Sequence, residues 1–141
     1  MTWLLITAFV LFAMAAVAKA AVDILTHQAG ANVFEVLGPW WDARTSWKRK
    51  YRDYDAGDLR PRFWGSTGPL VLLTDFWHLA DAVYLTTYYS AAFALGVALA
   101  SGSVWWFPVA LAGQKLYFGA VFELCYQRLF RKSPAAPILK A

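Results

Sequence analysis

The chain has 141 residues, of which 60% are hydrophobic and 16% are charged, and its formal net charge is +4. Soluble domains are typically about 45–50% apolar and about 25% charged, so this composition excludes an ordinary soluble fold. The length predicts one domain, residues 1–141. Because the positive charge flanks long apolar runs, it indicates anionic lipid as the partner and not nucleic acid.

The first apolar run predicts a membrane-spanning helix over about residues 2–27. This run exceeds the ~20 residues that a spanning helix needs, and Gly30 is typical of a helix end. Ala18-Lys19-Ala20 resembles a signal-peptidase site, but Met1–Leu4 lacks the basic residues that a secretory signal carries before its apolar core. We therefore expect this run to be retained as the first spanning helix.

The next segment, residues 28–69, is too polar to span a membrane and too aromatic to be a free linker. Its tryptophans and basic residues predict short pieces that lie on the cytoplasmic surface of the bilayer, with basic side chains toward lipid phosphates. We expect anionic head groups to be bound by Lys19, Arg44, Lys48, Arg49, Lys50 and Arg52.

Two further apolar runs predict a second helix over about residues 70–100 and a third over about 104–131. An uncharged turn, Ser101–Ser103, joins them, and residues 132–141 form a C-terminal tail. Pro108 suits the first turn of the third helix. Lys115 would then lie near the outer end of this helix, where its amine reaches water.

The distribution of basic residues predicts the orientation of the three helices. Basic residues gather between the first two runs and after the third, whereas the turn between the second and third runs has none. The positive-inside rule then puts the N-terminus outside and the C-terminus in the cytoplasm. The sequence thus predicts an all-α, multi-pass helical bundle in the cytoplasmic (inner) membrane.

Five polar residues near the predicted cytoplasmic ends of the first two helices form the candidate site. Asp23 and His27 are i,i+4 neighbours on the first helix. Asp75, His78 and Asp81 follow one another at intervals of three on the second. The same helix face continues along a stripe whose side chains become smaller toward the outer end. Close helix contacts in lipid favour small side chains, so we expect this face, with its three polar residues, to point into the bundle. The stripe consists of Ala82, Leu85, Tyr89, Ala92 and Gly96.

Two histidines and several carboxylates at the ends of facing helices are a ligand set for zinc or for non-haem iron or manganese. The predicted ligands of a divalent metal are Asp23, His27, Asp75, His78 and Asp81. In the most concrete hypothesis this cytoplasm-facing site performs metal-dependent or acid–base chemistry on a lipid or a small amphipathic substrate. Asp81 and His78 are then the candidate catalytic groups.

Other interpretations of the same residues stay open. Asp75 suits an N-cap of the second helix, and Asp23 can pair with Lys19. His27 and His78 can also be the axial ligands of a b-type haem. In a further alternative the chain is a non-enzymatic accessory subunit, either a homo-oligomer or part of a membrane complex. Cys125 is the only cysteine, and we expect it to fill apolar space.

Three blocks resemble a set of small bacterial membrane proteins of unknown function. These blocks are Ser46-Trp47-Lys48-Arg49-Lys50-Tyr51, Phe63-Trp64-Gly65-Ser66-Thr67 and Leu73-Thr74-Asp75-Phe76-Trp77-His78-Leu79. The resemblance covers roughly Trp41–Leu79 and departs at Asp42-Ala43, where those proteins tend to have Asn-Pro. It implies no activity.

Overall fold

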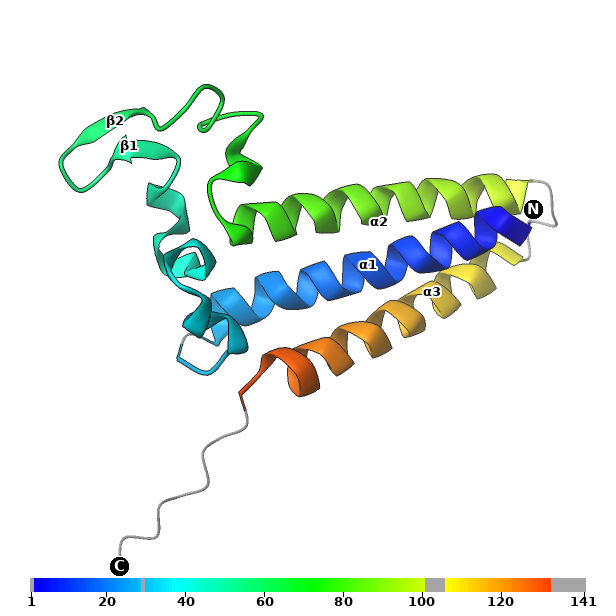
Figure 1. Cartoon of the computed structure of the whole chain (residues 1–141). Coiled ribbons are helices and arrows are strands. Elements are labelled where there is room, and N and C mark those ends of the chain that lie inside the picture. Colours follow the sequence, from blue (N-terminus) through cyan, green and yellow to red (C-terminus); the bar gives the residue numbers. More distant parts are fainter. Residues whose placement is uncertain (1, 29, 101–105, 133–141) are drawn as a thin grey trace, which may run out of the picture.

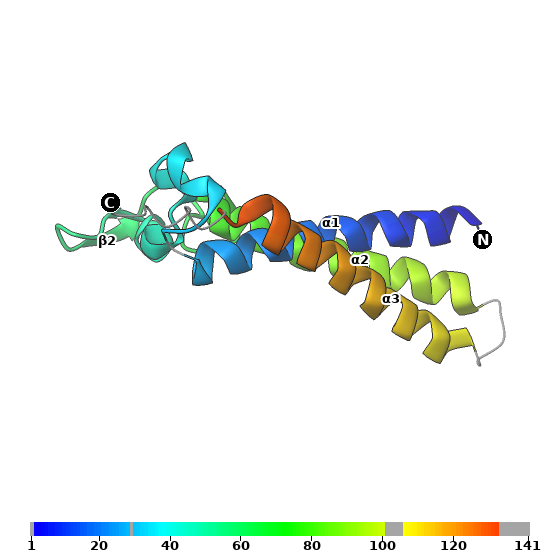
Figure 2. The same cartoon turned by 90° about the horizontal axis from the view of Figure 1, so that it is seen from below.

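The computed structural model describes residues 2–28, 30–100 and 106–132, and most of them are helical (Figure 1). Three long helices run side by side: α1 (Thr2–His27), α2 (Phe76–Ala100) and α3 (Trp106–Glu123). α1 packs along both of the other helices. Figures 1 and 2 show the three helix axes lying roughly alongside one another, with the chain of α2 running opposite to that of α1 and α3. The predicted helical class is confirmed, and α1 has the predicted bounds.

The contact between the helices is built mainly from alanine. Ala8 and Phe12 of α1 form a buried cluster with Ala91, Ala94 and Leu95 of α2. Small side chains let two helix backbones approach closely, so the packing does not require large side chains on both helices.

The second helix begins later than the sequence predicts. Residues Val71–Leu73 form a short 3₁₀ helix, η4, and α2 begins only at Phe76. Asp75 accepts a hydrogen bond from the backbone nitrogen of His78 at 3.1 Å, which is N-cap geometry. The local cap therefore determines where α2 starts, although the apolar run begins earlier.

The third helix continues beyond Glu123 as a π-helical segment, η5 (Leu124–Phe130). Its end is fastened to the chain that follows α1: Asn32 and Arg131 form an antiparallel bridge, and the Lys132 nitrogen donates to the Ala31 carbonyl at 2.8 Å. Residues 104 and 105 of the predicted third helix and residues 133–141 of the predicted tail lie outside the described residues.

The segment between α1 and α2 lies at one end of the bundle, opposite the end where the chain begins (Figure 1). It contains three short 3₁₀ helices, η1 (Val33–Leu37), η2 (Pro39–Trp41) and η3 (Ala43–Lys48). A hairpin of β1 (Tyr51–Asp53) and β2 (Asp58–Pro61) follows, with Gly57 at φ +78° in its turn. Short helical pieces agree with the prediction for this segment, whereas the hairpin was not predicted.

Two of the described helices, α1 and α2, are long and apolar enough to cross a membrane. This statement rests on length and composition alone. α3 does not meet the same criterion over its described residues, so a third span is not shown.

Candidate functional site

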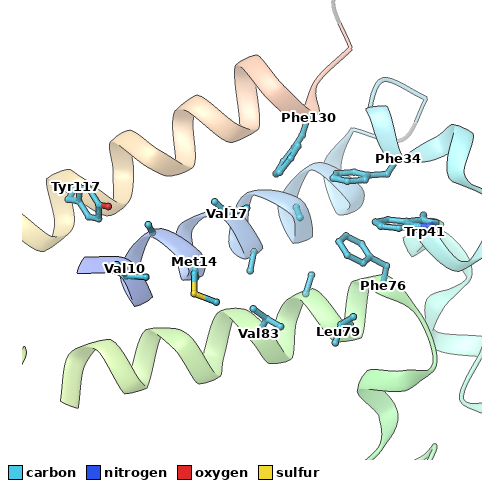
Figure 3. Close-up of a pocket in the computed structure, with 14 residues that line it drawn as sticks. Val10, Met14, Val17, Phe34, Trp41, Phe76, Leu79, Val83, Tyr117 and Phe130 are labelled. Carbon is cyan, nitrogen blue, oxygen red and sulfur yellow. The ribbon is translucent and has the colours of Figure 1, made fainter. Parts of the chain in front are cut away.

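An apolar cleft runs along one side of the bundle (Figure 3). Its volume is about 620 Å³, which lies in the range of about 300–1,000 Å³ that is usual for small-molecule sites. α1 provides Val10, Met14 and Val17, while Val83 of α2 and Tyr117 of α3 line it from the neighbouring helices. Because its lining is almost entirely apolar, the cleft suits a hydrocarbon chain and not a charged group.

An aromatic cluster closes the end of this cleft next to the segment between α1 and α2, residues 30–75, which we call the surface segment. The Phe34 and Trp41 rings stack with centroids 5.5 Å apart, and the centroid of Trp41 lies 3.9 Å from that of Phe76. Phe130 of η5 completes the cluster, 5.0 Å from Phe34. Four separate parts of the chain therefore meet here, and the surface segment becomes a wall of the cleft (Figure 3).

Asp75 and His78 form a compact hydrogen-bonded unit at the start of α2. The Asp75 carboxylate is fully buried, and its Oδ2 lies 2.8 Å from His78 Nδ1 and accepts from the Thr74 hydroxyl at 2.8 Å. A proton on Nδ1 leaves Nε2 of the partly exposed imidazole without a partner among the described residues. The predicted N-cap role of Asp75 is confirmed, and the His78 ring is held by the same carboxylate.

The two polar residues of α1 do not join this unit. Asp23 is paired with Lys19, one turn earlier on the same helix, and the Lys19 amine lies 5.9 Å from the centroid of the Tyr84 ring. His27 is the last residue of α1 and is exposed. Among the hydrogen bonds of the described residues, none links Asp23 or His27 to Asp75, His78 or Asp81.

The predicted inward stripe of α2 is wrong, because it faces outward. Leu85 is 42% exposed and Tyr89 is 68% exposed, and Ala92 and Gly96 are exposed as well. The face of α2 that packs in the bundle is instead made of small residues, namely Ala80, Thr87, Ala91, Ala94 and Ala98, with Leu95. Asp81 is partly exposed beside the outward stripe, and its side chain makes no hydrogen bond or ion pair within the described ranges.

The five predicted metal ligands are therefore not assembled into one centre. Within residues 2–28, 30–100 and 106–132, no group of three or more histidine, cysteine, aspartate and glutamate side chains is placed to hold a metal ion. The haem hypothesis stays a prediction: His27 is exposed at the end of α1, and the bond between His78 Nδ1 and Asp75 leaves Nε2 of His78 available as a ligand. Cys125 is buried, as expected of a small apolar filler.

Three cations of the surface segment are held by neighbouring carboxylates. Arg44 binds Asp42 at 2.9 Å, Arg60 binds Asp58 at 2.7 Å, and Lys48 pairs with Asp55. The side-chain hydrogen bond from Arg60 lowers the pKa of Asp58 to about 2, and that from Arg44 lowers the pKa of Asp42, so both carboxylates are ionised at neutral pH. These pairs reduce the positive charge that the segment offers to any anionic partner.

The remaining predicted head-group ligands differ in their surroundings. The Lys19 ammonium is engaged by Asp23, as described, and Arg49 donates to the Thr45 hydroxyl at 2.9 Å. The Lys50 ammonium lies 5.2 Å from the centroid of the Tyr51 ring, and Arg52 is exposed. Of the predicted set, Arg49, Lys50 and Arg52 have no ion pair in the described part of the chain, and the side chains of Lys50 and Arg52 have no hydrogen bond there either.

A second hollow, the α2–α3 groove, lies between those two helices and has a volume of about 360 Å³. It is lined by Tyr84 and Tyr88 of α2 and by Leu111, Gln114, Lys115 and Phe118 of α3. Gln114 donates to the Tyr88 hydroxyl at 3.2 Å, which fixes the two helices at the same level. Lys115 is exposed and has no hydrogen-bond or ion-pair partner among the described residues.

No known protein-family model matches the chain, and no curated protein or solved structure matches it either.

Sequence reasoning missed the cleft and the groove. Both are assembled from side chains of elements that lie far apart in the sequence, and no local motif marks them. The only signal for the cleft was the excess of aromatic residues around Phe34, Trp41 and Phe76, which the sequence assigns equally well to a membrane interface.

Proposed function

We propose that this chain is a lipid-binding accessory protein of the cytoplasmic membrane, and that it holds the hydrocarbon chain of an amphipathic lipid in the apolar cleft. The observation that carries the proposal is the cleft itself, with its volume of about 620 Å³ and its almost entirely apolar lining. A site with so few polar groups gives no anchor to a polar substrate, whereas a lipid chain needs only apolar contact.

The proposal includes all three helices as membrane spans, with the N-terminus outside and the surface segment and C-terminus in the cytoplasm. The basic residues between α1 and α2 and after α3 support this orientation. The cleft then opens to the half of the bilayer that adjoins the surface segment, and its aromatic end lies at the depth of the lipid head groups. Of the predicted head-group ligands, Lys50 and Arg52 have neither an ion pair nor a side-chain hydrogen bond among the described residues, so they are the best placed to meet anionic head groups.

This function assigns no catalytic step to His78. Phe76, Leu79 and Val83 of α2 line the cleft, and His78 lies ~200° around the helix from Phe76, at ~100° per residue. A lipid chain in the cleft and the His78 imidazole are thus on opposite sides of α2. Acid–base chemistry on the bound lipid would need the lipid to extend around the helix.

Filling the cleft should remove the bound lipid. The Val17→Trp variant places a bulky ring on the floor of the cleft, and the expected result is at least a fivefold loss of co-purified lipid per protein, measured by mass spectrometry of gently solubilised samples. Leu116→Trp is the matched control, because Leu116 is 75% exposed on α3 and does not line the cleft. Equal lipid content in both variants would overturn the proposal.

Cysteine labelling tests the orientation. In a Cys125→Ser background, Ala56→Cys at the exposed hairpin turn should react with a membrane-impermeant maleimide only after the cytoplasmic side is opened. Ser103→Cys, which lies outside the described residues, should react in intact cells. Ser46 is a poor labelling site, since it is buried. Labelling of both positions from the same side would contradict three spans.

A further inference from the structure

The outward face of α2 has a regular pattern that packing within one chain does not explain. His78, Leu85 and Ala92 recur at seven-residue spacing, with Tyr89 and Gly96 beside them. Seven-residue spacing is the pattern of a helix seam that packs against another helix. Leu85, Tyr89, Ala92 and Gly96 are nevertheless exposed, and added atoms at Gly96 would meet nothing within 4 Å. We propose that a second copy of this chain packs on this seam, α2 against α2, and that Asp81 of each copy binds His78 of the other.

Symmetry within a membrane makes this pairing reciprocal. Two copies inserted in the same orientation are related by a two-fold axis along the bilayer normal, so their α2 helices run parallel and equal residues lie at equal depth. This step rests on the membrane placement proposed above. His78 lies on the seam, and Asp81 lies ~60° to one side of it and only ~4.5 Å farther along the axis. Asp81 of one copy therefore lies next to the His78 of its partner, and the contact occurs twice.

The polar groups of the two residues are complementary. The Asp81 carboxylate has no hydrogen-bond partner among the described residues, and the Nε2 atom of His78 has none either, because the bond to Asp75 uses Nδ1. An ionisable group on the lipid face of a spanning helix is costly unless it is paired. In the dimer, His78 carries an N–H on each ring nitrogen, so that Nδ1–H donates to Asp75 of its own chain and Nε2–H donates to Asp81 of the other, and both unused groups gain a partner.

The α2–α3 groove supplies a second contact at the same interface. Tyr89 lies on the flank of the seam opposite to Tyr88, and it is 68% exposed. In a parallel two-fold pair, the Tyr89 side of one seam packs against the Tyr88 side of the other. Tyr89 of the second copy therefore faces the groove beside Tyr88. Its hydroxyl then lies at the level of Lys115 and Gln114, which can donate hydrogen bonds to it. Ala92 and Gly96 allow the two helices to approach closely.

Disulfide trapping tests the seam in the full-length protein. In a Cys125→Ser background, Ala92→Cys in liposomes at low protein-to-lipid ratio should give disulfide dimers on mild oxidation. A disulfide needs Cα atoms within about 7 Å, which only residues near the axis satisfy. Val97→Cys is the control, because Val97 is 45% exposed on the same helix but points away from the seam. Ala92→Cys should cross-link at least tenfold faster, and equal rates would overturn the proposed interface.

The pairing is tested separately with Asp81→Asn. Asp81 has no hydrogen-bond or ion-pair partner within the described part of its own chain, so the unfolding midpoint of the monomer in detergent should not change. Dimerisation in liposomes, followed by energy transfer between labelled copies, should weaken roughly three- to tenfold if two charge-assisted contacts are lost. Undiminished dimerisation of Asp81→Asn would overturn the Asp81–His78 pairing. Lipid content, measured on the same samples, reports on the cleft independently of either result.

Discussion

Replacing Asp75 by alanine should lower the free energy of unfolding by about 2–4 kcal/mol. The loss of an N-cap costs about 0.5–2 kcal/mol. Leaving the His78 Nδ1–H without its acceptor costs about 1–3 kcal/mol more, whereas the Thr74 hydroxyl keeps the Val71 carbonyl as an acceptor at 2.7 Å. Because Asp75 is fully buried, water cannot take its place without entering the junction between η4 and α2. Equilibrium unfolding in mixed detergent micelles, followed by circular dichroism, measures the change.

Asp55→Ala is the matched control for this prediction. Asp55 also pairs with a cation, Lys48, but its side chain is 76% exposed. An exposed ion pair contributes only about 0–1 kcal/mol, so the control should unfold almost as the parent does. If Asp75→Ala lost no more stability than Asp55→Ala, the buried carboxylate would not stabilise the start of α2.

Phe12→Ala should have the second large effect, a loss of about 2–3 kcal/mol in the same unfolding measurement. Phe12 is 1% exposed, and its ring meets the Tyr88 ring edge-on at 5.7 Å in the contact between α1 and α2. Comparable substitutions in soluble cores cost about 3–5 kcal/mol. The expected value is smaller here because the unfolded chain in a micelle still keeps its phenylalanine in apolar surroundings.

Phe93→Ala removes the same side chain from the surface of α2, where Phe93 is 74% exposed. This control should change stability by less than about 0.5 kcal/mol, as is usual for surface positions. A loss from Phe93→Ala equal to that from Phe12→Ala would mean that the α1–α2 contact is not the centre of the fold.

The existence of the helices could be predicted because their apolar runs are long and nearly free of charge. The inward face of α2 could not be predicted, because this helix is apolar nearly all round. The positions of Asp75, His78 and Asp81 suggested a different inner side. The structure shows that small residues mark the inward face instead, since Ala91, Ala94 and Ala98 are buried while Leu85 and Tyr89 are exposed. In this bundle, small side chains mark the contact between α1 and α2 better than polar ones do.

The candidate site was predicted only in its parts. The i,i+4 spacing correctly indicated the pairing of Lys19 with Asp23, and the position of Asp75 before a helix correctly indicated a cap. Both are local interactions that sequence spacing determines. A centre shared between α1 and α2 depends on how the helices are rotated about their axes, which spacing on either helix alone does not determine.

Buried polar residues of the surface segment and of the start of α2 lie within the sequence blocks 63–67 and 73–79. Ser66 is fully buried, and its hydroxyl donates to the Lys50 carbonyl at 2.7 Å, which ties the two ends of the hairpin region together. Thr74 and Asp75 form the junction before α2. Residues of these blocks thus have structural roles in this chain, and their presence need not signal a reaction.

The contacts that hold Ala31 and Asn32 to residues 131 and 132 can form only late in synthesis. The partners on the N-terminal side leave the ribosome about a hundred residues before those on the C-terminal side. Tyr117 and Phe130, which complete the third wall of the cleft, are also synthesised after both α1 and α2. On the function proposed above, the half-built cleft of α1 and α2 is open to the bilayer while α3 is still being translated. A lipid chain would then enter sideways at this stage and be covered when α3 arrives, so that loading would be part of biogenesis.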